Sequence, residues 1–236
     1  MYQTAADFIQ GPLGGRWPQG PSGDKLLLLN LPALVSQTLS AKRKSKPDRG
    51  SQPAASDEQN LLRRRRTELR VRRRPNENAW ELVHPRCALE RMEDLEEVQH
   101  MLDAGEVDVA IDELRWLLDG CSDFVAAHRL LGELALADGD LRLARGHFGY
   151  AYNVCISALP PRGLPGPLPY RLPVNQGFFE SAKGLAWCLH ELDKREMALD
   201  ILDQALKCDP TDPLGLRAWQ TAWRAEPRTP ESSDGK

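Results

Sequence analysis

A dense run of arginines is the part of this chain whose residue types most directly indicate chemistry. Guanidinium groups at this density can bind phosphates and release the counterions that surround them. No aromatic residue lies between Leu61 and Arg74, so the stacking of single-stranded bases on side chains is not indicated. The candidate residues for an anionic partner are Arg63, Arg64, Arg65, Arg66, Arg70, Arg72, Arg73 and Arg74.

Charge is segregated along the sequence. Residues 41 to 75 hold 13 lysines and arginines against 4 acidic residues, a net charge of +9, whereas residues 76 to 158 hold 6 against 17, a net charge of −11. Opposite blocks predict either a basic arm for a nucleic acid or anionic surface, or a solvated arm that rests on the acidic part of its own chain. Both interpretations stay open at this point.

Residue patterns typical of catalysis are not found. The sequence His84-Pro85-Arg86-Cys87 has no second Cys/His pair at the spacing of a zinc site. There is neither a GxxxxGK phosphate loop nor a nucleophile elbow, and His128 is interpreted as a helix-packing residue. We therefore expect a protein that is not an enzyme and holds no cofactor or metal.

Cysteine spacing and the lack of a targeting segment bear on the compartment. Cys87, Cys121 and Cys155 are spaced by 34 and 34 residues, which predicts three equivalent, half-buried thiols on helices and not a disulfide framework. The apolar run within residues 26–39 is too short to span a bilayer, and it is interpreted as a short element that docks on the chain's own repeats or on a partner. Free thiols fit a reducing compartment, so we expect a cytoplasmic protein.

The same interval of 34 residues recurs elsewhere, as in Gly105 and Gly139 or Ala110 and Ala144. A period near 34 is typical of stacked helical hairpins. Apolar residues at helical spacing, together with glycine and proline stops, predict the individual helices. Their ranges are 88–103, 107–118, 124–137, 141–156, 178–192, 195–207 and 214–224.

Three of these hairpins resemble tetratricopeptide (TPR) repeats. The unit at 125–158 matches the family pattern best, and its matching residues are Leu131, Gly132, Gly139, Asp140, Ala144, Phe148 and Ala151. The other units are 91–124 and 179–212, and 213–226 resembles a closing helix. The resemblance implies an all-α TPR-type helical-hairpin solenoid, which is usually a binding surface.

The resemblance also implies a concave groove lined by the first helix of each unit. Arg129, Lys183 and Arg217 occupy the same place in successive units, so a ladder of cations could hold an acidic peptide or a terminal carboxylate. That ladder is similar to the one in the carboxylate-clamp TPR subgroup, although the asparagine expected one turn further on is missing. The groove candidates are Gln99, Arg129, Glu133, Lys183, Trp187, His190 and Arg217.

The domain organisation follows from these patterns. Residues 1–75 are predicted to be a disordered arm, 76–226 the TPR-like domain and 227–236 a disordered tail. A proline-rich insertion at 159–177 separates the second and third units. It is interpreted as a passive spacer, as a cover for the groove, or as a segment that presents Tyr170 and Arg171 to a partner.

The function expected from the sequence is a scaffold or adaptor that captures a peptide segment of a partner protein in the groove. The alternative is a nucleic-acid-associated regulator anchored by the arginine-rich arm, whose binding would fall steeply with salt.

Overall fold

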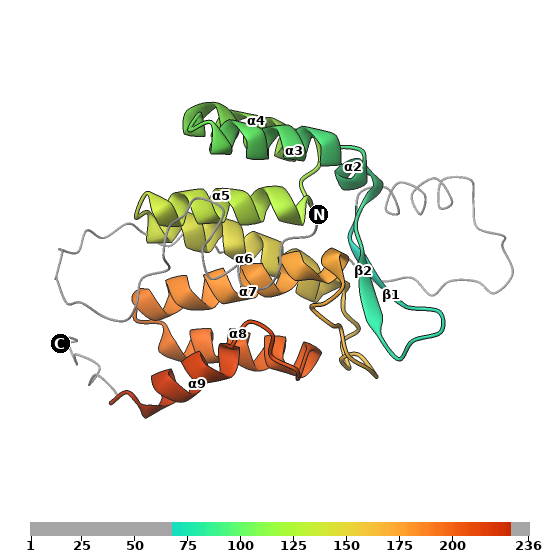
Figure 1. Ribbon diagram of the computed structural model, residues 1–236. Coiled ribbons are helices and arrows are strands. Elements are labelled where there is room, and N and C mark those ends of the chain that lie inside the picture. The colour runs from blue at the N-terminus through green and yellow to red at the C-terminus, as the bar shows by residue number, and fades with distance from the viewer. Residues whose placement is uncertain (1–67, 228–236) are drawn as a thin grey trace, which may run out of the picture. The chain divides into compact units, whose positions relative to one another are not determined.

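The computed structural model describes residues 68–227 (Figure 1). Within that range the chain is mostly helical and also contains one small sheet. The elements in order are β1 (Arg70–Arg73), β2 (Trp80–Val83), α2 (Arg86–Leu89), α3 (Met92–Asp103), α4 (Val107–Gly120), α5 (Val125–Ala137), α6 (Leu141–Ala158), α7 (Pro173–Glu191), α8 (Arg195–Cys208) and α9 (Leu216–Ala225). The predictions for the apolar segment at 26–39, for Arg63 to Arg66 and for the tail from 228 onward lie outside the described residues.

The helices predicted from the apolar spacing are confirmed in number and approximate position from α3 to α9. Gly105 and Gly139 follow α3 and α5 with φ of 79° and 81°, the left-handed conformation that glycine adopts without strain. After α7 the same role falls to Asp193, with φ of 57°. The first helix was predicted too long, because the chain breaks between α2 and α3 at Glu90 and Arg91.

The predicted helical fold is present, and the structure adds a small two-stranded sheet that begins before residue 76. Arg70–Arg73 forms β1, which pairs antiparallel with Trp80–Val83 in the register Arg70 to Val83 and Arg73 to Trp80. Val71 lies between exposed arginines, as in a strand with one apolar face. The high charge of the run favoured the interpretation as a disordered arm instead. The inner residue Leu82 is 2% exposed, so the hairpin is part of the folded structure.

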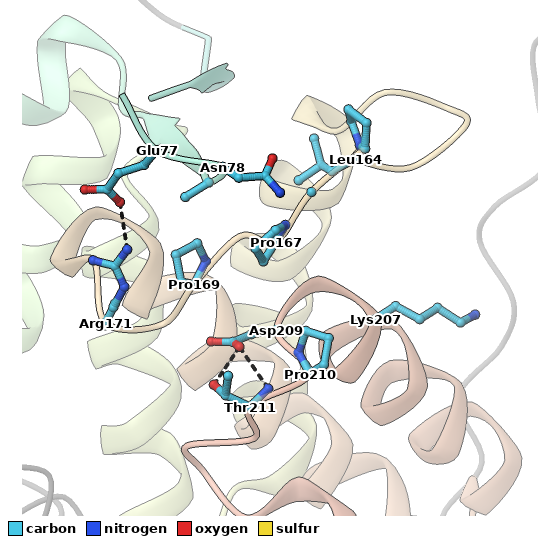
Figure 2. A pocket seen from close by; sticks show the side chains of 13 residues that line it. Glu77, Asn78, Leu164, Pro167, Pro169, Arg171, Lys207, Asp209, Pro210 and Thr211 are labelled. Carbon is cyan, nitrogen blue, oxygen red and sulfur yellow. Dashed lines mark hydrogen bonds and ion pairs between the residues drawn. The ribbon is translucent and has the colours of Figure 1, made fainter. Parts of the chain in front are cut away.

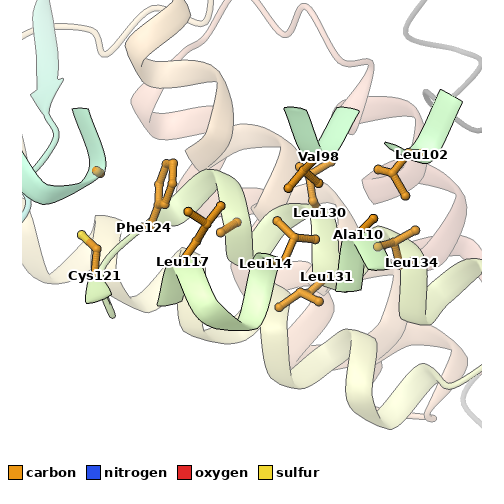
Figure 3. Packing of buried hydrophobic residues seen from close by; sticks show 12 residues of the cluster. Val98, Leu102, Ala110, Leu114, Leu117, Cys121, Phe124, Leu130, Leu131 and Leu134 are labelled. Carbon is orange, nitrogen blue, oxygen red and sulfur yellow. The ribbon is translucent and has the colours of Figure 1, made fainter. Parts of the chain in front are cut away.

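Successive helices pack against one another, and α5 also packs against α7 (Figure 1). The apolar residues of α3, α4 and α5 form a continuous cluster, in which Val98, Leu114 and Leu117 are completely buried (Figure 3). Further along the chain, Phe148 of α6 is 1% exposed and fills the space between α5 and α7. The packing therefore links each hairpin to the next.

The proline-rich insertion is an integral part of this packing. Its last five residues belong to α7, which begins at Pro173 because proline is favoured in the first helical turn. The preceding segment is held from two sides, since Trp80 N donates to Pro167 O at 2.8 Å and Leu168 N donates to Cys208 O at 2.8 Å. Leu168 is completely buried, so the segment is packed against the rest of the fold.

Two of the three evenly spaced cysteines form a disulfide, which corrects the interpretation of them as free thiols. Cys87 of α2 is bonded to Cys121 at the end of α4, whereas Cys155, Cys188 and Cys208 are free and buried. Burial raises the pKa of Cys188 to about 12 and that of Cys208 to about 11, so these thiols stay protonated and unreactive. The sequence spacing placed Cys87 in a repeat position, but the break before α3 turns α2 back toward α4.

Removing this disulfide with Cys87→Ser and Cys121→Ser is expected to lower the free energy of unfolding by about 3 to 4 kcal/mol, because the bond closes a loop of 34 residues. Urea denaturation of the full chain measures the change. A reductant should destabilise the unmodified protein by a similar amount and should leave the double variant unaffected. A denaturation midpoint that does not respond to reductant would contradict the prediction.

Candidate functional site

An ion network links α5 to α7 at two of the predicted groove positions. Arg129 donates to Glu133 Oε1 at 2.5 Å within α5, and its Nε lies 3.1 Å from Glu180 Oε2 of α7. Tyr170 of the proline-rich segment donates its hydroxyl to Glu180 at 3.2 Å. The guanidinium group is thus fixed in place by two carboxylates and is only 17% exposed.

Partial burial gives this network unusual electrostatics. Burial opposes the charge of Arg129, but the attraction of Glu133 and Glu180 outweighs it and raises the pKa of Arg129. Burial and the neighbouring Glu180 raise the pKa of Glu133 against the effect of Arg129. Burial also lowers the pKa of Lys183, and Glu180 and Asp212 oppose that shift. Removing Arg129 alone would leave two carboxylates facing each other in a poorly solvated site.

Trp187 and His190 are packing residues that join α7 to α9. The ring centroid of Trp187 lies 5.5 Å from that of Trp219, and the ring of His190 stacks on Trp223 at 4.2 Å with an interplanar angle of 9°. Trp187 is only 7% exposed. The Lys183 ammonium lies 5.2 Å from the centre of the Trp219 ring, a cation–π contact at the edge of this aromatic cluster.

The predicted ladder of cations is not a row of unpaired charges. Arg217 donates to Pro210 O at 2.6 Å and lies 3.9 Å from Asp212, so it braces the loop between α8 and α9. Gln99 donates to Asp103 on its own helix, α3, at 3.3 Å. Arg129 and Glu133 of α5 and Lys183 of α7 lie on the same side of the helices. Each cation of the ladder interacts with another residue of the chain: Arg129 with Glu133 and Glu180, Lys183 with Trp219, and Arg217 with Asp212.

The described arginines of the basic run divide into paired and exposed residues. Arg72 donates to Glu81 Oε1 at 2.5 Å across the hairpin, and Arg74 lies 3.7 Å from Glu81 Oε2. Arg70 and Arg73 are exposed. The second half of the run is therefore partly a structural element, and the anionic-partner interpretation for Arg63 to Arg66 stays a prediction.

A pocket that the sequence did not predict lies elsewhere, between the hairpin turn, the proline-rich segment and the end of α8 (Figure 2). Its volume is about 720 Å³, within the range of ordinary ligand pockets. Arg171, one of the two residues suspected of presenting itself to a partner, lies at its edge and donates to Glu77 at 2.7 Å. In the sequence, the repeated prolines were the one feature that could have pointed to a pocket here. The other two segments that line it lie about 85 residues before and about 40 residues after the proline-rich segment, so the sequence could not show that they meet.

His128 and His147 form a pair on α5 and α6, which supports the interpretation of His128 as a packing residue. Their Nδ1 atoms lie 3.3 Å apart, and His128 Nε2 lies 3.1 Å from Ser122 O. Burial, with a smaller effect of His147, lowers the pKa of His128 to about 4. Burial and Arg115 lower the pKa of His147.

Acid is therefore expected to destabilise the fold through these histidines. A histidine whose pKa is lowered by folding binds fewer protons in the folded chain, so its contribution is complete above about pH 6.5 and is lost as the pH falls toward 4. After allowance for the partial exposure of the ring, the loss from His128 is about 2 kcal/mol. Urea denaturation between pH 7 and pH 4 should show a flatter profile for His128→Gln, and identical slopes for the two proteins would contradict the assignment.

In residues 68–227 no cluster of three or more His, Cys, Asp or Glu could hold a metal ion. Within the same residues no helix is long and apolar enough to cross a membrane. Comparisons with models of protein families, with curated proteins and with solved structures found no match.

Proposed function

We propose that this chain is a non-catalytic adaptor of the TPR type, which captures a segment of a partner protein on the face shared by α5, α7 and α9. The observation that supports it is the side-by-side placement of alternate helices: the Arg129–Glu180 ion pair joins α5 to α7, and the Trp187–Trp219 contact joins α7 to α9. A face that crosses several hairpins suits an extended chain better than a small substrate.

The interactions on this face change the expected chemistry of the partner. Arg129 is already held by Glu133 and Glu180, so a simple clamp for one carboxylate is not the preferred mode. The face instead offers fixed charges of both signs on α5 and α7, together with Trp219, which is half-buried and contacts Lys183. An extended segment that exchanges hydrogen bonds with the network and packs an apolar side chain near Trp219 would use both features.

The test uses peptides selected from a displayed random library on the full chain. Binding is measured by fluorescence anisotropy for the unmodified protein and for Lys183→Gln with Arg217→Gln, which changes α7 and α9. The control is Arg142→Gln with Arg145→Gln, the same loss of charge at two exposed positions of α6. Arg129 is not substituted, because its removal would leave the carboxylates of Glu133 and Glu180 without their cation.

We expect the α7–α9 variant to weaken binding by about tenfold or more, and the α6 control to bind as the unmodified protein does. Circular dichroism should show unchanged helicity in both. Equal affinity of the two variants, or a library that yields no saturable binder, would argue against the adaptor function on this face.

A further inference from the structure

The pocket in Figure 2 is a preformed site on a different part of the molecule from the α5–α7–α9 face. Three segments line it, and hydrogen bonds connect each to the next. Trp80 N donates to Pro167 O at 2.8 Å, and Tyr170 N donates to Asp209 Oδ2 at 2.7 Å. A ligand would therefore find the walls already in place, which lowers the entropic cost of binding.

One wall of the pocket is a strip of proline rings. Pro165, Pro167 and Pro169 line the pocket together with Leu164 and Gly166, and Leu168 is completely buried. Proline has no N–H, and this wall offers flat apolar surface with few donors. A flat apolar ring is the group that buries most area against such a strip.

The hydrogen-bond acceptors around the pocket are already bonded to groups of the protein, whereas some of the donors are not. Asp209 is 3% exposed, and its two oxygens accept from Tyr170 N, Thr211 N and the Thr211 hydroxyl. Glu77 accepts from Arg171, which lowers the pKa of Glu77.

The donors have capacity left. Lys207 is exposed in the last turn of α8, and it makes no ion pair with any residue between 68 and 227. The Arg171 side chain is 63% exposed and uses one of its nitrogens on Glu77. Figure 2 shows the Asn78 amide between the hairpin turn and Pro167. The charge that remains available at the rim is therefore positive.

We propose that this pocket binds a partner peptide through an aromatic side chain that lies next to a carboxylate. The ring packs on the proline strip, and the carboxylate accepts a hydrogen bond from Lys207 at the rim. The volume of about 720 Å³ accommodates an aromatic side chain with a neighbouring residue. This is a second binding site, whose lining residues do not include Arg129, Lys183 or Arg217.

The probe for this site is indole-3-acetate, which combines the ring and the carboxylate, with indole and acetate as its two halves. The full chain is titrated with each compound and followed by ¹H–¹⁵N NMR. The indole N–H of Trp80 serves as the reporter, because Trp80 lies beside Gly166 of the pocket. Its signal is assigned from a Trp80→Phe variant.

Indole-3-acetate should shift the Trp80 signal saturably and bind at least about threefold more tightly than indole, with acetate alone weaker still. Lys207→Gln should reduce its affinity to that of indole. The control Lys194→Gln, an exposed lysine at the other end of α8, should leave it unchanged. Asn78→Trp, at an exposed turn position, should fill the pocket and abolish the shift.

Three results would overturn the proposal: no saturable shift at Trp80, equal affinity for indole and indole-3-acetate, or the same loss for Lys207→Gln and Lys194→Gln. None of them affects the adaptor proposal, since Lys183 and Arg217 do not line this pocket. Lys183→Gln alone, which leaves the hydrogen bond from Arg217 to Pro210 in place, should likewise leave the indole-3-acetate titration unchanged.

Discussion

Replacing Asn175 by alanine is expected to lower the free energy of unfolding by about 5 kcal/mol. Asn175 is completely buried at the start of α7. Its Oδ1 accepts from Leu82 N at 2.9 Å, and its Nδ2 donates to Trp80 O at 3.2 Å and to Pro169 O at 3.0 Å. Each buried group left without a partner costs about 1 to 3 kcal/mol, so the three losses add up to the expected value.

The side chain joins three segments, and this gives the prediction a local signature. Urea denaturation measures the total loss, and hydrogen exchange should show Leu82 N losing its protection before the helices do. The neighbouring Gln176→Ala is the control, because Gln176 is only half-buried and makes no hydrogen bond among those found in residues 68–227. Equal losses for the two variants would refute the role of Asn175.

Asn175→Asp separates the donor from the acceptor function. The carboxylate retains an acceptor for Leu82 N but loses the donors to Trp80 O and Pro169 O, and it places a charge in a buried site. Burial would raise its pKa in the folded state, so this variant should regain stability as the pH falls and the carboxyl becomes a donor. A variant that lacks this recovery would show that the side chain acts by shape alone.

The second large effect is expected at Phe148, where Phe148→Ala should cost about 4 kcal/mol. Its ring lies between two helices at positions without side chains: a Cβ on Gly132 of α5 would lie 2.8 Å from the ring, and one on Gly184 of α7 would lie 2.7 Å away. Both glycines are therefore needed for close packing. Gly184→Ala should destabilise the fold by about 1 to 3 kcal/mol, although alanine favours helices.

Gly146 is the matched control for this prediction. It lies in α6, the helix of Phe148, and a Cβ there would meet nothing within 4 Å. Gly146→Ala should therefore stabilise the chain by about 0.5 to 1 kcal/mol, the sign opposite to that of Gly184→Ala. Thermal or urea denaturation distinguishes the two signs. In a double variant, Phe148→Leu should restore part of the stability lost through Gly184→Ala, and strict additivity would contradict direct contact.

Apolar spacing and glycine stops were sufficient to predict the helices from α3 to α9, because both are local properties of the chain. Gly105 and Gly139 adopt the left-handed conformation that their places after α3 and α5 require. The repeat pattern also picked out Phe148 and its small neighbours Ala144 and Ala151. All three are completely or almost completely buried on α6. TPR membership remains part of the proposal, supported by the spacing and by the succession of helices.

The predicted groove residues show the limit of such patterns. Spacing placed Arg129 and Lys183 on equivalent turns, but it could not reveal that Glu180 comes from the next hairpin to pair with Arg129. The side chains of Trp187 and His190 were predicted to face a partner, and they pack on Trp219 and Trp223 of α9 instead. Which charges stay available depends on neighbours distant in sequence.

The sequence by itself determined the helical hairpins, their period and the segregation of charge, because propensity, amphipathic spacing and composition act over a few residues. Only the tertiary structure decided the β-hairpin of Arg70–Arg73 and Trp80–Val83, the Cys87–Cys121 bond and the proline-lined pocket. Each of these joins residues that are distant or weakly patterned in sequence. Their formation depends on long-range contacts, such as those of Asn175, that no local preference encodes.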